Sequence, residues 1–246
     1  MSQDYAVELN NITMRFTMCK ERLSNLKEYF LKFMKRQLEF ENFTALDDVS
    51  LKIEKGDVFG IVGLNGSGKS TMLKIISGIL TPTAGTVETD GVIAPLIELG
   101  AGFDMELTAR ENIYLNGSVL GFSRAYMDEK FDEIVEFSEM QDFLDTPMKN
   151  YSSGMVARIG FAIATMTTPD ILIVDEILAV GDFKFQEKCE KRISDMINNG
   201  KTTVIVVSHS LGQIERLCRH CAWLEKGHLK MVGETEEVCS AYKAAY

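Results

Sequence analysis

The sequence of 246 residues lacks the features of membrane, secreted and nucleic-acid-binding proteins. No apolar run approaches the roughly 20 residues that a membrane-spanning helix needs. The first ten residues lack the basic segment and apolar run of a secretory signal, and the five cysteines are an odd number without the spacing of a disulfide framework. With 26 Lys and Arg against 36 Asp and Glu, the net charge of −10 argues against nucleic-acid binding. We therefore expect a reduced, cytosolic protein that cannot cross a membrane alone.

Charge is distributed unevenly along the chain. Residues 104–145 hold eleven acidic side chains and three basic ones, whereas residues 20–36 hold six basic side chains and two acidic ones. Such asymmetry indicates that the two segments have different neighbours. The overall composition, 46% hydrophobic and 25% charged, is that of a globular protein with a substantial core.

Three short runs are apolar on both faces, which is typical of buried parallel strands. They cover residues 58–62, 171–174 and 203–207, and helical patterns cover residues 69–80, 183–198 and 211–217. Turn residues after the first helix predict a hairpin near residues 82–91. Residues 108–161 show a helical pattern without a buried strand. The sequence therefore predicts an α/β fold with a mainly parallel sheet and an inserted α-helical subdomain at residues 104–160.

A C-x-x-C pair, Cys218 and Cys221 with His220 between them, is a possible metal site. Zinc sites usually take four ligands, and no second pair follows in the sequence. Two small buried side chains are the alternative that we favour.

The clearest chemical motif is the glycine-rich run GLNGSGKS at residues 63–70, between a predicted strand and a predicted helix. It matches G-x-x-x-x-G-K-[ST], in which backbone N–H groups surround phosphate oxygens. Lys69 is expected to reach the β- and γ-phosphates, and the Ser70 hydroxyl is expected to ligate Mg²⁺. The motif predicts a nucleoside triphosphate site.

Polar residues follow two of the predicted strands where they end. Asp175 and Glu176 follow the strand at 171–174, and Ser208 and His209 follow the strand at 203–207. Ligands of open α/β sheets bind at the carboxyl ends of strands. We expect Asp175 to hold Mg²⁺, Glu176 to act as general base and His209 to contact the γ-phosphate. The alternatives are acids that complement a helix dipole and a structural histidine.

The run YSSGM at residues 151–155 begins 24 residues before Asp175 and opens a predicted helix at 156–166. It resembles the signature loop of ABC ATPases, usually LSGGQ, although Ser153 and Met155 depart from that pattern. The resemblance extends over nearly the whole chain and implies an ABC-type P-loop NTPase with an additional small antiparallel β region. We expect one such ATP-binding domain over residues 1–246.

The resemblance also implies roles for individual residues. Lys69, Glu176 and His209 take part in hydrolysis, Asp182 closes the D-loop, and Glu98 stands where a glutamine usually contacts metal and water. Phe16 matches the aromatic residue that stacks on adenine, with a core residue as the alternative. The nucleotide contacts come from Phe16, Gly63, Leu64, Asn65, Gly66, Ser67, Gly68, Lys69, Ser70 and Thr71, and the contacts to a partner's ATP come from Tyr151, Ser152, Ser153, Gly154 and Met155.

More narrowly, YSSGM, LGAGF at 99–103 and LAVGD at 178–182 resemble the ATP-binding subunits of O-antigen and teichoic acid exporters. This implies ATP and Mg²⁺ as cofactors, a head-to-tail homodimer around two ATP, and two transmembrane permease subunits at the cytoplasmic face of the membrane. We expect no C-terminal carbohydrate-binding domain. The alternatives are an ABC ATPase of another transporter, a soluble non-transport ABC ATPase, and a catalytically silent scaffold.

An insert at residues 17–44 is longer than in many ABC ATPases. It combines basic residues with apolar ones at near-helical spacing: Leu23, Leu26, Phe30, Phe33 and Met34. Such a helix suits the inner leaflet or the permease, and packing on its own domain is the alternative. By analogy with the family, the groove beside residues 98–103 is expected to receive a permease helix.

Overall fold

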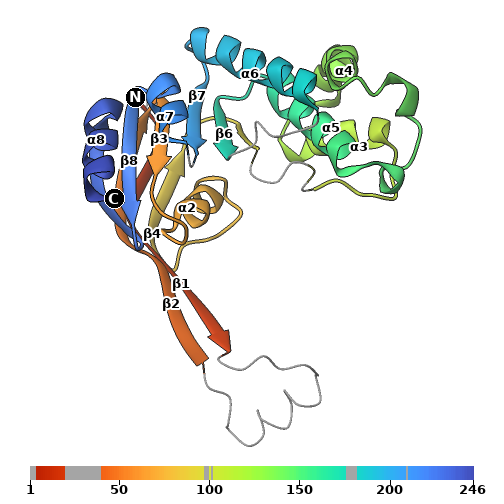
Figure 1. The fold of residues 1–246 in the computed structure, drawn as a ribbon. Coiled ribbons are helices and arrows are strands. Elements are labelled where there is room, and N and C mark those ends of the chain that lie inside the picture. Colours follow the sequence, from red (N-terminus) through yellow and green to blue (C-terminus); the bar gives the residue numbers. More distant parts are fainter. Residues whose placement is uncertain (1–3, 20–39, 97–99, 101, 176–181, 209) are drawn as a thin grey trace, which may run out of the picture.

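A computed structural model describes residues 4–19, 40–96, 100, 102–175, 182–208 and 210–246. Its centre is a six-stranded sheet in the order β5-β6-β7-β3-β8-β9 (Figure 1). All neighbours pair in parallel except β8 and β9, which are antiparallel. The strands are β3 (Val58–Val62), β5 (Ile93–Pro95), β6 (Ile171–Asp175), β7 (Thr203–Val207), β8 (His220–Glu225) and β9 (His228–Glu234).

The predicted strands at the centre of this sheet are confirmed. All residues of β3 and β7 are buried, because both faces of the sheet are covered. Val207 pairs with Ile61 of β3 and with Asp175 of β6. The carboxyl ends of β3, β6 and β7 therefore meet at one edge of the sheet, where an open α/β sheet binds its ligand.

A second, antiparallel sheet has the order β2-β1-β4, with β1 at Tyr5–Cys19, β2 at Phe40–Glu54 and β4 at Ala84–Thr89. Apolar residues of β1, β2, β3 and α2 (Lys69–Ile76) share one core. β1 and β2 pair as far as Cys19 and Phe40, and this hairpin projects from the body (Figure 1). The two ends of the predicted insert are therefore strand, and its amphipathic part, residues 20–39, lies outside the described residues.

The expected helical subdomain is present. Its α-helices are α3 (Ala109–Val119), α4 (Arg124–Ser138) and α5 (Ser153–Met166), with short 3₁₀ turns η1 (Gln141–Phe143) and η2 (Met148–Asn150). They enclose a separate core that includes Ile113, Met127 and Ile163. α3 begins with a capping box, in which Thr108 and Glu111 satisfy each other's backbone N–H groups.

Three further helices, α6 (Phe183–Asn198), α7 (Leu211–Leu217) and α8 (Thr235–Ala245), contribute to a core on the other face of the central sheet. α6 and α7 have the predicted bounds. Within the described ranges, no helix is long and apolar enough to cross a bilayer. Cys218 and Cys221 are buried, and burial raises the pKa of the Cys218 thiol to about 12. Both side chains belong to this apolar core, and the described part of the chain brings no group of three or more His, Cys, Asp or Glu residues together as metal ligands.

Two details of the predicted secondary structure are wrong. The first helix ends at Ile76 rather than at residue 80, because Gly78 adopts a left-handed conformation and the N–H groups of Ile79 and Leu80 both turn back to the carbonyl of Lys74. The predicted hairpin is absent as well, since β4 pairs with β1 in one sheet and β5 pairs with β6 in the other. Glycine and proline residues in a sequence indicate where the chain turns, but they do not determine which strands pair on either side of the turn.

Candidate functional site

The glycine-rich loop joins β3 to the start of α2 and leaves that helix without a side-chain cap. Gly68 is the N-cap residue, in a left-handed conformation with φ 107°. A Cβ atom at this position would lie 2.6 Å from the carbonyl oxygen of Ala45, so only glycine fits. The uncapped N–H groups of the first turn are therefore available to an anion.

Lys69 is the first residue of α2 and is only 7% exposed. Its Nζ donates hydrogen bonds to the carbonyl oxygens of Gly63, at 2.7 Å, and Leu64, at 3.0 Å. Burial lowers the pKa of Lys69, and the negative charge of Asp175 opposes that shift. The loop thus holds the ammonium group close to two uncharged carbonyl oxygens. Negatively charged phosphate oxygens would form stronger hydrogen bonds with it.

A hollow of about 250 Å³ opens beside this loop. Its walls come from the glycine-rich loop, from β2 and from the ends of β6 and β7; the lining residues are Phe43, Ala45, Asn65, Gly66, Gly68, Lys69, Ser70, Thr71, Asp175 and Val207. Ser70 and Asp175 line the same hollow. Hydroxyl, carboxylate and phosphate oxygens are the ligands that Mg²⁺ prefers, so these residues fit the predicted cation.

Two aromatic residues lie opposite each other on β1 and β2. Phe16 pairs with Phe43, and Phe16 is half-buried against the core shared by the two sheets. Phe43 is 47% exposed and lines the hollow, which Phe16 does not. Sequence reasoning missed Phe43, because it lies 20 residues before the loop and its place beside the hollow depends on the pairing of β1 with β2.

The signature-like loop opens α5 and is built differently from the glycine-rich loop. Ser152 is the N-cap, and its hydroxyl accepts a hydrogen bond of 3.2 Å from the backbone N–H of Met155. The Tyr151 hydroxyl donates to the carbonyl of Phe143 and fixes the residue before the cap. Ser152 and Ser153 are exposed, and no residue of this loop lines the hollow.

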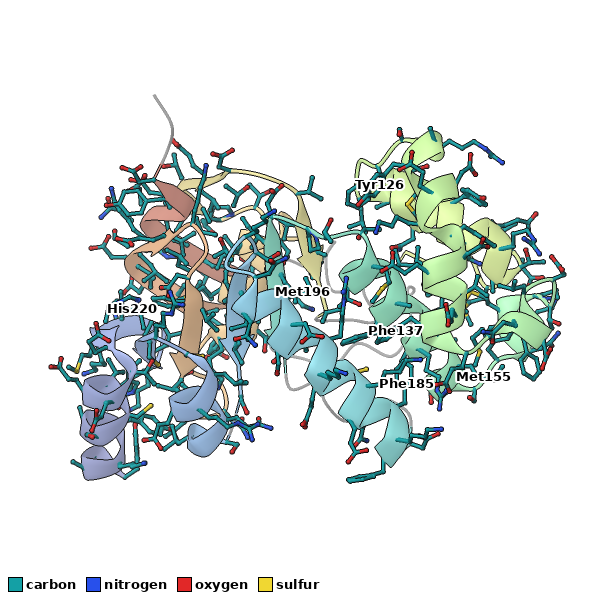
Figure 2. All side chains as sticks on the ribbon, turned by 90° about the horizontal axis from the view of Figure 1, so that it is seen from above. Tyr126, Phe137, Met155, Phe185, Met196 and His220 are labelled. Carbon is teal, nitrogen blue, oxygen red and sulfur yellow. The ribbon has the colours of Figure 1, made fainter. Side chains whose placement is uncertain are left out.

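A network of charges connects the signature helix with Asp182, the N-cap of α6. Arg158 of α5 donates to Asp182 at 2.6 Å and to Glu139 at 2.8 Å, and its guanidinium lies over the ring of Phe185. Figure 2 shows Phe137 and Phe185 where α6 meets the helical subdomain. The hydrogen bond from the Phe185 backbone N–H, together with the charge of Arg158, lowers the pKa of Asp182. Arg158 was missed; its position four residues after Gly154 is the only sequence signal.

Glu176 and His209, two of the predicted catalytic residues, and Glu98, predicted to stand in place of the usual glutamine, lie outside the described residues. The residues that precede Glu176 and His209 lie at the expected edge of the sheet, since Asp175 ends β6 and Ser208 directly follows β7. The Ser208 hydroxyl donates to the Gln213 side chain at 2.8 Å and accepts from the N–H of Ser210. The residues on both sides of position 209 are therefore fixed.

A second hollow, of about 520 Å³, lies between the central sheet and the helical subdomain. Gly100 and Phe103 line it, and both belong to residues 98–103, beside which analogy with the family places a groove. Ile79 and Val119, which are both exposed, lie on its lining as well. This surface is apolar and open, as a docking site for a helix would be.

A parallel sheet with a glycine-rich loop at its switch edge, a small antiparallel sheet and a helical insertion together define a P-loop NTPase of the ATP-binding cassette type. The family model described as ABC transporter matches residues 46–179. The chain belongs to the ABC transporter family, whose ATP-binding proteins are ATPases. The fold and family expected from the sequence are therefore confirmed.

Relatives align along almost the whole chain. It is 39% identical to the O-antigen export system ATP-binding protein RfbB of Klebsiella pneumoniae, over 97% of this chain and 98% of that protein. It is 42% identical to the teichoic acids export ATP-binding protein TagH of Lactiplantibacillus plantarum, over 99% of this chain and 66% of that protein. A solved dimer of the ATP-binding cassette MJ0796 with ADP and phosphate has the same fold, with a TM-score of 0.72 at 24% identity over 93% and 98% of the two chains.

Proposed function

We propose that this protein is the ATP-hydrolysing subunit of an exporter of a lipid-linked surface polysaccharide or teichoic acid. The observation that carries the ATPase role is the hollow that joins the uncapped start of α2, Lys69, Ser70 and Asp175. The relatives named as O-antigen and teichoic acid export proteins support the cargo.

Each wall of the hollow has a distinct role in this proposal. Backbone N–H groups at the start of α2 and the Lys69 ammonium bind the β- and γ-phosphates. Ser70 and Asp175 would hold Mg²⁺, which neutralises charge that develops on the phosphates. Phe43 offers an exposed ring to the nucleotide base. Glu176 accepts a proton from the attacking water, and His209 orients the γ-phosphate.

The site is completed by a second copy of the chain. The exposed start of α5 presents backbone N–H groups, yet none of its residues reaches the hollow of its own subunit. Head-to-tail pairing would place the Ser152–Gly154 turn of one copy over the γ-phosphate bound by the other. ATP then holds the two copies together, and hydrolysis separates them.

Coupling to transport takes place at a membrane permease. The apolar hollow with Ile79, Phe103 and Val119 is the surface that we assign to a permease helix. It lies between the sheet that carries the ATP site and the subdomain that carries the signature, so closure of the dimer would move it. The subunit would accordingly work at the cytoplasmic face of the membrane, bound to two permease subunits.

The test measures ATP hydrolysis by the protein alone and after reconstitution in lipid with its permease. We expect activity to rise with the permease and to disappear in Glu176→Gln. The exposed α4 variant Glu136→Gln is the matched control and should hydrolyse ATP like the wild type. Equal activity with and without the permease, and no association with it, would leave the ATPase role standing and overturn the transport role.

A further inference from the structure

The turn between β8 and β9 is bonded directly to the glycine-rich loop. The backbone N–H of Gly227 donates to the carbonyl of Ser67 at 2.9 Å. On its other side, the carbonyl of Gly227 accepts a hydrogen bond of 2.9 Å from the N–H of Asp47 in β2. One residue of the C-terminal hairpin thus connects two walls of the hollow, the phosphate loop and the strand that carries Phe43 and Ala45.

The conformation of this turn admits no side chain at position 227. Lys226 and Gly227 both have positive φ, 48° and 82°, as in a two-residue hairpin turn of type I′. A Cβ atom on Gly227 would lie 2.9 Å from the carbonyl oxygen of Ala45. That oxygen belongs to the backbone and cannot swing away, so a larger residue would push the turn away from β2.

The loop itself packs against the same neighbours. A Cβ atom on Gly63 would run into the carbonyl oxygen of Leu224, at the end of β8, and one on Gly68 would approach the carbonyl oxygen of Ala45. Ser67 lies between these two glycines and is only 4% exposed. The glycine-rich loop therefore has its shape set from outside, by β8, by β2 and by the turn that joins β8 to β9.

We infer that Gly227 is a positioning residue of the ATP site, holding the Ser67 carbonyl and with it the backbone of Gly68, so that the N–H groups at the start of α2 face the phosphates. The inference rests on the proposed function, because it assumes that the hollow binds ATP. Displacing the turn alters the loop and the β2 wall together, and this weakens nucleotide binding even though residue 227 is not among the lining residues.

Gly227→Ala tests the inference, with binding of a fluorescent ATP analogue in the presence of Mg²⁺ and the thermal midpoint as the two readouts. We expect the dissociation constant to rise about tenfold, which corresponds to 1.4 kcal/mol. The matched control is Gly200→Ala, since Gly200 is also left-handed, with φ 64°, but a Cβ atom there would meet no other atom within 4 Å. It should lose thermal stability through the same backbone strain and bind the analogue with unchanged affinity.

Hydrogen exchange of the wild type provides a test that needs no variant, in case Gly227→Ala does not fold. Nucleotide should slow exchange at residues 225–228 and leave residues 231–234 of β9 unaffected. The inference fails if nucleotide does not change the exchange rate at the turn. It also fails if the wild type binds the analogue and Gly227→Ala and Gly200→Ala bind it with equal affinity. A wild type that binds no nucleotide would instead overturn the proposed function on which the inference rests.

Discussion

The two helix starts that we assign to phosphate, those of α2 and α5, differ in construction. At α2 the N-cap is a left-handed glycine without a side-chain bond, and a buried lysine and a carboxylate line the hollow beside it. At α5 the N-cap is Ser152, whose hydroxyl accepts a hydrogen bond from the backbone N–H of Met155. Ser152 and the first residue of the helix, Ser153, are exposed to solvent.

The difference shows which half of a binding site each start can supply. The α2 start has walls on several sides from distant parts of the chain, so it can hold a ligand by itself. The α5 start offers dipole and N–H groups without walls, and a single exposed helix end binds an anion weakly in water. Its use therefore requires a second surface, which is the physical argument for a shared site.

The largest expected effect tests whether the two starts act across two subunits. Lys69→Ala and Ser152→Ala should each lower ATP turnover by about 10²–10³, the usual loss when one group that stabilises the transition state is removed. Mixing the two variants creates dimers with one site in which both residues are intact. Single-turnover phosphate release should therefore recover in the mixture. A mixture as inactive as its components would contradict the shared site.

The next effect separates capping from ligand binding at α5. Ser152→Ala and Ser123→Ala each remove an N-cap hydroxyl that accepts a backbone hydrogen bond of 3.2 Å. Both should therefore lower the free energy of unfolding by about 1 kcal/mol. Only Ser152→Ala should also impair ATP hydrolysis. If Ser123→Ala impaired hydrolysis equally, the role of Ser152 would be that of a cap alone.

A smaller effect is expected where the signature helix meets α6. Arg158→Ala removes the guanidinium that lies over Phe185 and bonds Glu139 and Asp182, and we expect a loss of about 2 kcal/mol in unfolding free energy. Its match is Arg110→Ala, because Arg110 also lies over a ring, that of Phe131, and bonds Asp145, but is 44% exposed.

Urea unfolding and ATP turnover of the two arginine variants give the measurement. Arg110→Ala should lower the free energy of unfolding much less than Arg158→Ala does, as is usual for exposed ion pairs, and should leave turnover unchanged. Arg158→Ala should lower turnover several-fold, since Asp182 then loses its link to the signature helix. Equal turnover of the two variants would show that this link does not matter for hydrolysis.

The smallest effect concerns pH and arises at His220, the first residue of β8 (Figure 2). Its Nδ1 lies 2.8 Å from a carboxylate oxygen of Asp57, and Nε2 lies 3.4 Å from Glu234. The hydrogen bond to Asp57, with the negative charges of Asp57, Glu234 and Glu54, raises the pKa of His220.

Because the folded protein binds this proton more tightly than the unfolded chain, the stabilisation is complete below the ordinary histidine pKa of about 6.5. It is lost as pH rises through the raised pKa of the folded state. Urea unfolding of the wild type and of His220→Gln at a series of pH values measures it. Their free energies of unfolding should converge at alkaline pH, and a difference that grows with pH would contradict the assignment.

The sequence by itself determined the elements in which neighbouring residues act together. The order strand, glycine-rich loop, helix is encoded within residues 58–76, and Asp175 is placed by the strand that precedes it. Buried strands apolar on both faces predicted the parallel sheet, and the helical pattern of residues 108–161 predicted the subdomain, because periodicity is a local property.

Only the tertiary structure decided which distant residues complete the site. Phe43 reaches the hollow through the pairing of β1 with β2, Arg158 reaches Asp182 where two helices meet, and Gly227 bonds Ser67 from 160 positions away along the chain. Each contact depends on how sheets and helices pack against one another. A sequence pattern indicates which face of its helix or strand a residue occupies. Which residue of another element it contacts is determined by the packing of the whole fold.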